Sequence, residues 1–208
     1  MRDAIVYIVD DDEMVRRALA RMVRTAGLEV ATFRSARAFL DRPREDALEC
    51  LVLDVRLPGS SGLDLQAQLA TEGNDLPIVF ITGHGDVQTT VRAMKGGAVD
   101  FLEKPFDGRA LLACIHRALE LSRRSRARRN EVTELGRRLS RLTPREREVL
   151  THVVMGKLNK QIASDLDIAE KTIKVHRGRV MGKMQAESVA DLVRIAQKLE
   201  LQDQQLAR

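Results

Sequence analysis

Five polar side chains stand at or shortly after the ends of apolar runs in the first half of the chain. They are Asp10 and Asp11 after AIVYIV, Asp54 after CLVL, Thr82 after PIVFI, and Lys104 after AVDFL. Carboxylates that lie close together repel one another unless a cation neutralises them. Their hard oxygens suit Mg²⁺, which binds a few carboxylates together with water and phosphate oxygens. The residue types therefore predict a Mg²⁺-dependent acid cluster if the fold brings them together.

The chemistry that such a cluster could perform is phosphoryl transfer onto Asp54. A carboxylate can serve as a nucleophile, and Mg²⁺ with the Lys104 ammonium would offset charge on the moving phosphoryl group. The Thr82 hydroxyl could then donate a hydrogen bond to the phosphoryl oxygens. Taken singly, residues 10–12 also fit a solvated acidic turn and Lys104 an ordinary surface lysine, so the prediction depends on their joint placement.

The elements that must position these residues alternate regularly. Strands are predicted at 4–10, 28–33, 50–55, 77–82 and 98–102, and helices at about 13–26, 35–42, 62–72, 86–96 and from 107. Three of the strands are continuously apolar, as in strands that are buried on both faces of a parallel sheet. We therefore expect an α/β domain with a doubly wound five-stranded parallel sheet, whose ligands bind beyond the carboxyl ends of its strands.

The segments IVDDDE, LVLDVRLPGSSG, VFITGHGD and DFLEKPF resemble the receiver domain of bacterial two-component response regulators, over about residues 3–121. The resemblance implies that Asp54 is the phosphoacceptor. It implies that Thr82 and Lys104 form a switch pair, and that Phe101 is an aromatic that turns inward on activation. A simple core aromatic is the other interpretation of Phe101.

The same resemblance implies a set of Mg²⁺ ligands and two residues that tune the phosphate's lifetime. The implied ligands are Asp11, Asp54 and the backbone carbonyl of Arg56, with Asp10 adjacent. Arg56 lies two residues after Asp54, and His84 lies two residues after Thr82. In receivers, side chains at these places face the attacking water, so we predict that Arg56 and His84 modulate hydrolysis of phospho-Asp54.

A phosphatase of the haloacid-dehalogenase type is an alternative from another functional class. Such enzymes also use an Asp nucleophile, a Ser or Thr, a Lys and Mg²⁺, and they carry a second Asp two residues after the nucleophile. Arg56 occupies that place here and stays protonated, so it cannot act as the acid and base. We therefore expect no turnover of external substrates, and a turnover assay would test this.

The second half of the chain contains no run that is typical of a strand. Residues 122–140, which include RRSRARR, are predicted to be a helical linker, and a disordered basic tether is the alternative. Thr143, Pro144 and Glu146 have the spacing of a capping box with proline at the first helical position. Helices are expected at about 144–155, 159–165, 170–184 and 188–199, with a short turn at LDIAE.

Residues 141–208 are predicted to form a four-helix DNA-binding domain, because 141–199 resemble the LuxR-type helix-turn-helix. The resemblance is carried by LTPREREVL and by GKLNKQIASDLDIAEKTIKVHRGRVMGKM. At 100° per residue, Ile173, Val180 and Met184 share one face of helix 170–184 and should pack on the core. The opposite face would be free to enter a major groove.

The predicted DNA contacts lie on or near that helix. Lys174 and Val175 match positions of the family that approach base edges. Phosphate contacts are expected from flanking residues, and the full predicted set is Lys160, Lys171, Thr172, Lys174, Val175, Arg177, Gly178, Arg179 and Lys183. Gly178 replaces the longer side chain that family members often carry, and it either permits close approach to the groove or is merely tolerated. A solvated helix face is the alternative for the whole set.

Charge and cysteine usage agree with this division. Residues 1–116 hold 14 Lys and Arg against 18 Asp and Glu, whereas residues 117–208 hold 21 against 12. An acidic module joined to a basic one suggests a nucleic-acid partner for the second. Cys50 and Cys114 sit in apolar segments and predict buried thiols in a reducing cytoplasm. No apolar run approaches the ~20 residues of a membrane span.

Within the response regulators, phrases such as ITGHGDV and NKQIA give the chain a resemblance to the FixJ branch. The implied partners are a sensor histidine kinase, promoter DNA, a second copy of the chain after phosphorylation, and RNA polymerase. The face built from helix 86–96 and strand 98–102 is expected to dimerise. The competing hypothesis is a phosphorylation-controlled interaction protein that never touches DNA, which promoter protection would distinguish.

Overall fold

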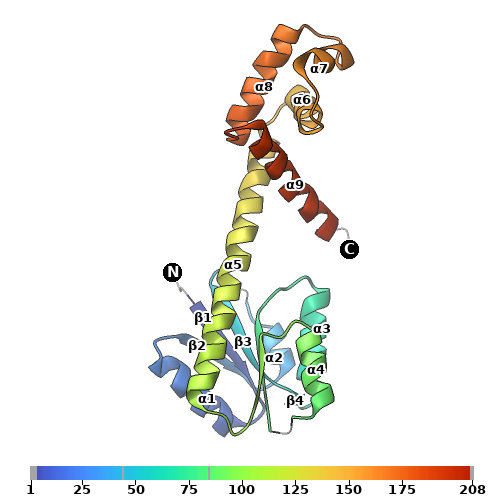
Figure 1. Ribbon diagram of the computed structural model, residues 1–208. Helices are drawn as coiled ribbons and strands as arrows, with labels where there is room; N and C mark the ends of the chain where they lie inside the picture. The colour runs from blue at the N-terminus through green and yellow to red at the C-terminus, as the bar shows by residue number, and fades with distance from the viewer. Residues whose placement is uncertain (1–3, 44, 84, 207–208) are drawn as a thin grey trace. The chain divides into compact units, whose positions relative to one another are not determined.

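The computed structural model describes residues 4–43, 45–83 and 85–206, with side chains up to residue 199. The chain divides into two compact units, residues 1–126 and residues 127–208. The long helix α5 (Gly108–Ser140) begins in the first unit and ends in the second (Figure 1). The division therefore falls inside the segment that was predicted to be a linker.

The first unit is the predicted five-stranded parallel sheet with helices on both faces. Its strands are β1 (Ala4–Val9), β2 (Glu29–Phe33), β3 (Leu48–Asp54), β6 (Ile78–Thr82) and β7 (Asp100–Glu103). They lie in the order β2-β1-β3-β6-β7, and all neighbours are parallel. The helices are α1 (Glu13–Thr25), α2 (Ala36–Leu40), α3 (Gly62–Thr71), α4 (Val87–Lys95) and the first part of α5.

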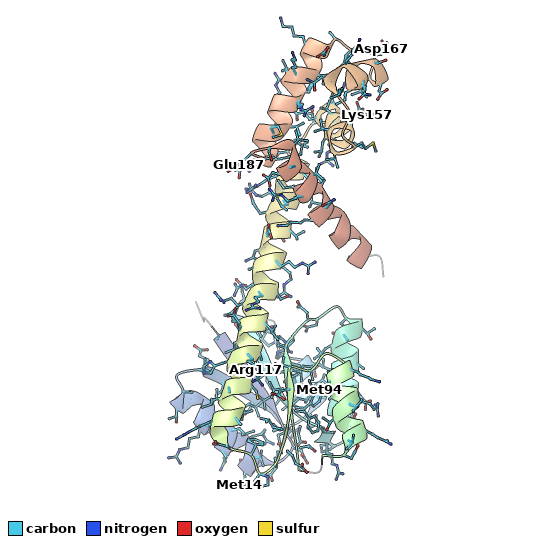
Figure 2. The ribbon with its side chains drawn as sticks, in the orientation of Figure 1. Met14, Met94, Arg117, Lys157, Asp167 and Glu187 are labelled. Atoms are coloured by element: carbon cyan, nitrogen blue, oxygen red, sulfur yellow. The ribbon has the colours of Figure 1, made fainter. Side chains whose placement is uncertain are left out.

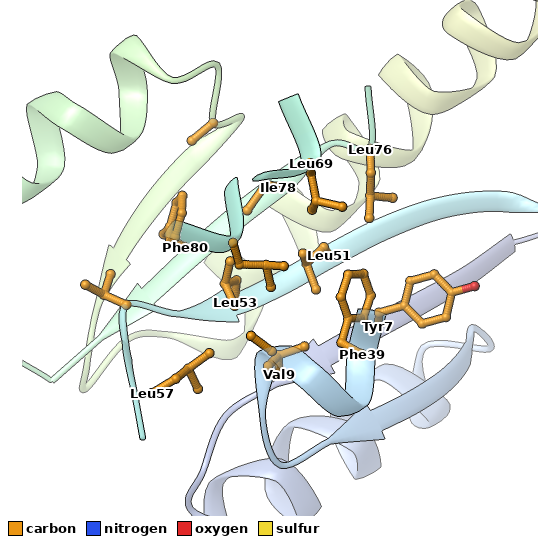
Figure 3. Close-up of a cluster of buried hydrophobic side chains, with 14 of the residues drawn as sticks. Tyr7, Val9, Phe39, Leu51, Leu53, Leu57, Leu69, Leu76, Ile78 and Phe80 are labelled. Atoms are coloured by element: carbon orange, nitrogen blue, oxygen red, sulfur yellow. The ribbon is translucent and has the colours of Figure 1, made fainter. Parts of the chain in front are cut away.

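Alternation along the strands gives this sheet two separate cores. On β1, Tyr7 and Val9 face the cluster that packs against α2, α3 and α4, as the close-up in Figure 3 shows. Val6 and Ile8 face the other cluster, which α1 and α5 cover. Successive side chains of a strand point to opposite faces, so a strand that is covered on both sides must be apolar throughout. The predicted doubly wound fold is confirmed.

A short antiparallel hairpin beyond β3 was not predicted. It pairs β4 (Arg56–Leu57) with β5 (Ser60–Ser61) around Gly59, whose φ is +83°. Two-residue strands are too short to produce a periodic hydrophobic pattern. The hairpin begins two residues after Asp54, so it lies next to the carboxyl end of β3.

The described residues of the second unit contain helices joined by short turns and no strand. It contains the end of α5 together with α6 (Pro144–Val154), α7 (Asn159–Asp165), α8 (Glu170–Met184) and α9 (Val189–Leu206). The predicted capping box is present, since Thr143 and Glu146 exchange hydrogen bonds at the start of α6. α9 runs past residue 199, where its expected end was placed, because residues 200–206 contain neither Gly nor Pro.

The core of the second unit includes residues from the predicted linker. Leu135 is 5% exposed and Leu139 packs beside it, against buried residues of α6, α8 and α9. The Arg138 guanidinium donates a hydrogen bond to the carbonyl of Met184 at 3.3 Å, which satisfies an end of α8. The last turns of α5 therefore belong to this unit as a structural helix.

Candidate functional site

The acid cluster lies where the strand order of the sheet reverses. β2 lies on one side of β1 and β3 on the other, so the carboxyl ends of β1 and β3 border the crevice where ligands bind in such folds. Asp10 directly follows β1, and Asp54 is the last residue of β3. Side-chain oxygens of Asp10, Asp11 and Asp54 lie within 4.8 Å of one another. The fold thus brings the three predicted carboxylates together.

The three neighbouring acids after β1 have different environments. Asp10 is fully buried and its Oδ1 accepts a hydrogen bond from the backbone N–H of Asp12 at 2.8 Å, whereas Asp11 is exposed. Asp12 is the N-cap of α1 and accepts from two backbone N–H groups of the first turn. The acidic run is therefore not uniform, since its first member is buried, its second is exposed and its third caps a helix.

Lys104 follows β7, an edge strand of the sheet, and its side chain reaches the cluster from there. Its Nζ lies 2.7 Å from Oδ2 of Asp10 and 2.9 Å from Oδ2 of Asp54. A backbone hydrogen bond of 2.6 Å from the Lys104 N–H to the Thr82 carbonyl ties the residue after β7 to the end of β6. Thr82 itself is fully buried. The ammonium therefore bridges two carboxylates that would otherwise repel each other.

Burial and this bridge set the titration of the cluster. Desolvation raises the pKa of Asp54, although hydrogen bonds from Lys104 and from the backbone N–H of Arg56 act in the lowering direction. Burial works to lower the pKa of Lys104, but its hydrogen bonds to Asp10 and Asp54 outweigh burial and raise it. Lys104 is consequently held as the cation, and the Asp54 carboxylate is more basic than an exposed one.

The remaining predicted residues of this site are arranged as follows. Arg56 is exposed, and its backbone N–H donates to Oδ1 of Asp54 at 3.1 Å. Phe101 is half-buried, with its ring centroid 6.3 Å from that of Phe80. His84, which was predicted to influence phosphate hydrolysis, lies outside the described residues.

In the second unit, α8 has the two predicted faces. Ile173, Val180 and Met184 are fully buried, which confirms the predicted core face. Val175, one of the two predicted base-edge contacts, is 48% exposed. Exposure is shared by most of the predicted DNA contacts, namely Lys160, Lys171, Thr172, Lys174, Val175, Gly178 and Arg179.

Two of the predicted DNA contacts are instead engaged within the protein. The Arg177 guanidinium donates to Oδ1 of Asn159 at 2.9 Å, which ties α8 to the start of α7. Lys183 pairs with the buried Glu146 at 2.6 Å, and it also donates to the Arg141 carbonyl. Their partners lie on other elements of the unit, so helical periodicity alone could not reveal these contacts.

Sequence comparison assigns both units. Residues 6–116 match the response regulator receiver domain, and residues 140–196 match the bacterial regulatory proteins of the luxR family. The chain belongs to the response regulators. It is a transcriptional regulator with a receiver and a LuxR-type DNA-binding domain, and its family is not a typical enzyme family.

Relatives of this response regulator align over nearly its whole length. Nodulation protein W of Bradyrhizobium diazoefficiens is 50% identical over 94% of this chain and 86% of its own. The transcriptional regulatory protein FixJ of Rhizobium meliloti is 45% identical over 94% of this chain and 96% of its own length. Among solved structures, the response regulator StyR has a TM-score of 0.83 at 47% sequence identity, and the match covers 94% of this chain and 99% of StyR. The structure of full-length FixJ from B. japonicum has a TM-score of 0.58 at 39% sequence identity, and the match covers 97% of this chain and 99% of that one.

No helix in the described part of the chain is long and apolar enough to cross a membrane. Both cysteines are buried and free, Cys50 on β3 and Cys114 on α5. Burial raises the pKa of Cys114 to about 11, helped by its hydrogen bond with Asp100. The prediction of buried thiols is confirmed.

Proposed function

We propose that the regulator is switched by a phosphoryl group that a sensor histidine kinase transfers to Asp54. The observation that carries the proposal is the Lys104 ammonium, which lies within 3 Å of both Asp10 and Asp54. An oxygen of Asp54 would form the new bond to phosphorus while the bond from phosphorus to the donor breaks. Lys104 is placed to contact the transferred group, because it already contacts the nucleophile.

We further propose Mg²⁺ as the cofactor. The donor set supports this, since it consists of carboxylate oxygens on a cluster that needs positive charge. Asp11, Asp54 and the backbone carbonyl of Arg56 would hold the ion, with Asp10 adjacent. When bound, the ion would offset charge on the transferred phosphoryl group. Arg56 stays protonated and offers no general base, so we propose that external substrates are not turned over.

The switch itself is assigned to Thr82, Lys104 and Phe101. Thr82 would move its hydroxyl toward the phosphate, and the half-buried Phe101 would pack inward. Three exposed apolar residues of α4 then offer a surface for a second copy: Val87 is 80%, Val91 43% and Met94 44% exposed. Their spacing places them on one face of α4, and Met94 can be found in Figure 2. Dimers would bring two α8 helices to adjacent DNA half-sites.

We propose that the exposed basic face of α8 binds promoter DNA in the cytoplasm, with RNA polymerase as a further partner. Lys174 and Val175 are assigned to base edges, and Lys160, Lys171, Thr172 and Arg179 to phosphates or the groove's rim. Gly178 lies on the same face. Arg177 and Lys183 remain in the proposed set. To contact DNA, Arg177 would have to keep or give up its hydrogen bond to Asn159, and Lys183 its ion pair with Glu146.

The first test is labelling of Asp54. Wild-type protein incubated with acetyl phosphate and Mg²⁺ should gain one phosphoryl group, measured by intact mass, and Asp54→Asn should gain none. Asp41→Asn, an exposed carboxylate paired with Arg37, is the matched control and should label normally. Labelling that persists in Asp54→Asn, or labelling that ignores removal of Mg²⁺, would reject the assignment.

A second test separates the dimer step from the chemistry. Val91→Glu should leave acetyl phosphate labelling unchanged, because Val91 is exposed on α4 and lies outside the acid cluster. The same variant should stay monomeric after labelling in analytical ultracentrifugation, whereas labelled wild type should dimerise. A labelled Val91→Glu protein that dimerises like wild type would remove α4 from the interface.

A further inference from the structure

Arg16 on α1 contacts the backbone that carries two acids of the cluster. Its Nη1 donates hydrogen bonds to the carbonyl oxygens of both Asp10 and Asp11, each at 2.8 Å. These carbonyls lie just past the end of β1, which ends at Val9. A single half-buried guanidinium thus satisfies two successive carbonyls.

The position of Arg16 follows from the start of α1. Asp12 caps the helix, and the N–H of Arg16 donates to the Asp12 carbonyl at 3.0 Å. Helical side chains lean toward the N-terminus of their helix, so Arg16 points back to the loop that precedes it. Nη1 carries two hydrogens and the group is permanently charged, which allows two charge-assisted bonds from one nitrogen.

The two acids depend on this contact to different degrees. The Asp10 carboxylate is also fixed by the Asp12 N–H and by Lys104. For Asp11, the hydrogen bond observed among the described residues is the one that its carbonyl accepts from Arg16, and its carboxylate is exposed. The direction of the Asp11 side chain is therefore set by its backbone, and Arg16 holds that backbone.

We infer that Arg16 is a positioning residue for cation binding, which holds the Asp10–Asp11 peptide so that both carboxylates face Asp54. The inference rests on the proposed Mg²⁺ site. It assigns no ligand role to Arg16, whose Nη1 donates to the two carbonyl oxygens. Removing a group that hydrogen-bonds to a metal-binding residue and orients it commonly lowers the affinity for the metal 10- to 100-fold.

The sign of the effect distinguishes positioning from simple electrostatics. A guanidinium near a cation site repels the cation, so loss of the charge alone would tighten Mg²⁺ binding. Loss of the two carbonyl contacts frees the loop and weakens binding. We expect the second effect to dominate, because the bonds are short and the Arg16 side chain is partly withdrawn from water.

The experiment measures Mg²⁺ affinity of the full-length protein by isothermal titration calorimetry. Arg16→Met should bind Mg²⁺ about 10- to 100-fold more weakly than wild type. Arg17→Met is the matched control, since Arg17 is exposed and pairs only with Glu13 among the described residues, and it should bind like wild type. Arg16→Lys keeps the charge and should be intermediate, which also covers the case in which Arg16→Met does not fold.

A second readout needs no metal. Hydrogen exchange of the backbone amides of residues 11 and 12 should be faster in Mg²⁺-free Arg16→Met than in Arg17→Met. Equal exchange together with equal or tighter Mg²⁺ binding in Arg16→Met overturns the inference while leaving the proposed function intact. A wild-type protein that binds no Mg²⁺ and takes no label from acetyl phosphate overturns the proposed function as well.

Discussion

The acid cluster and the exposed face of α8 are both charged, but they are built in opposite ways. In the cluster, Asp10 is fully buried, Asp54 is 8% exposed, and both contact Lys104. On α8, Lys171 and Lys174 lie in solvent above a fully buried Ile173. In the acid cluster the buried charges contact one another, whereas on α8 the charged side chains are exposed and the buried face of the helix holds them in place.

This difference determines what each site can do. Buried charges in contact are sensitive to the loss of any partner, because the remaining charge is left desolvated. Exposed lysines interact through a screened field, and their removal leaves the fold almost unchanged. Substitutions of the buried charges in the cluster should therefore change stability and metal binding together, and substitutions of the exposed lysines Lys171 and Lys174 should change DNA affinity alone.

The largest effect is expected for Lys104→Met. It leaves Asp10 and Asp54 facing each other without their cation, so the free energy of unfolding should fall by about 2–4 kcal/mol. Added Mg²⁺ should restore part of the loss, and urea unfolding with and without Mg²⁺ measures both. Lys95→Met at the exposed end of α4 should change stability by less than about 0.5 kcal/mol. A Lys104→Met protein as stable as wild type would show that the bridge is dispensable.

Lys174→Ala should produce the second largest effect, on DNA rather than on folding. Operator binding should weaken by about 1–3 kcal/mol if Lys174 reads a base, with the unfolding midpoint unchanged. Fluorescence anisotropy over a range of salt concentrations measures the affinity and its salt slope. Wild-type affinity would remove Lys174 from the interface, and a flat salt slope for wild type would argue against phosphate contacts altogether.

Glu146→Gln tests a buried charge inside the otherwise exposed DNA-binding unit. Its hydrogen bond with Lys183, then that from the Thr143 backbone, hold the pKa of Glu146 below its ordinary value. Gln retains the capping box but loses the ion pair, so stability should fall by about 1–2 kcal/mol at pH 7. The exposed Glu148→Gln should cost under ~0.5 kcal/mol.

The pH dependence of that variant has a definite sign. Because the folded pKa of Glu146 is lowered, its stabilisation is fully present above the unfolded pKa and is lost as pH falls through the folded value. The stability gap between wild type and Glu146→Gln should therefore narrow during an acid titration followed by circular dichroism. A gap that stays constant down to acid pH would contradict the ion-pair explanation.

The smallest effect is expected for Gly178→Ala. Beyond its own turn of helix, no atom of the described residues lies within 4 Å of a Cβ added there, so the substitution should stabilise α8 by up to ~1 kcal/mol. Thermal unfolding checks this, and a lower melting temperature would contradict it. Operator affinity of the same variant then separates the two interpretations of Gly178, since only a close approach to the groove would make the added methyl group weaken binding.

The sequence by itself determined the order of the elements and the candidate residues at the strand ends. Continuous apolar strands specify a sheet that is covered on both faces, and parallel strands bring their carboxyl ends to one edge. The buried face of α8 also followed from the sequence, because Ile173, Val180 and Met184 recur at helical spacing. Periodicity is a local property, and one sequence is enough to read it.

The tertiary structure decided which partners the charges have. Lys104 and Asp54 are 50 residues apart, Lys183 and Glu146 are 37 apart, and no local pattern distinguishes either pair from exposed charges. In the folded protein Asp12 caps α1, and Arg16 donates hydrogen bonds to two carbonyls. The end of α5 packs into the core of the second unit. Burial and distance control these contacts, and both exist only once the chain has folded.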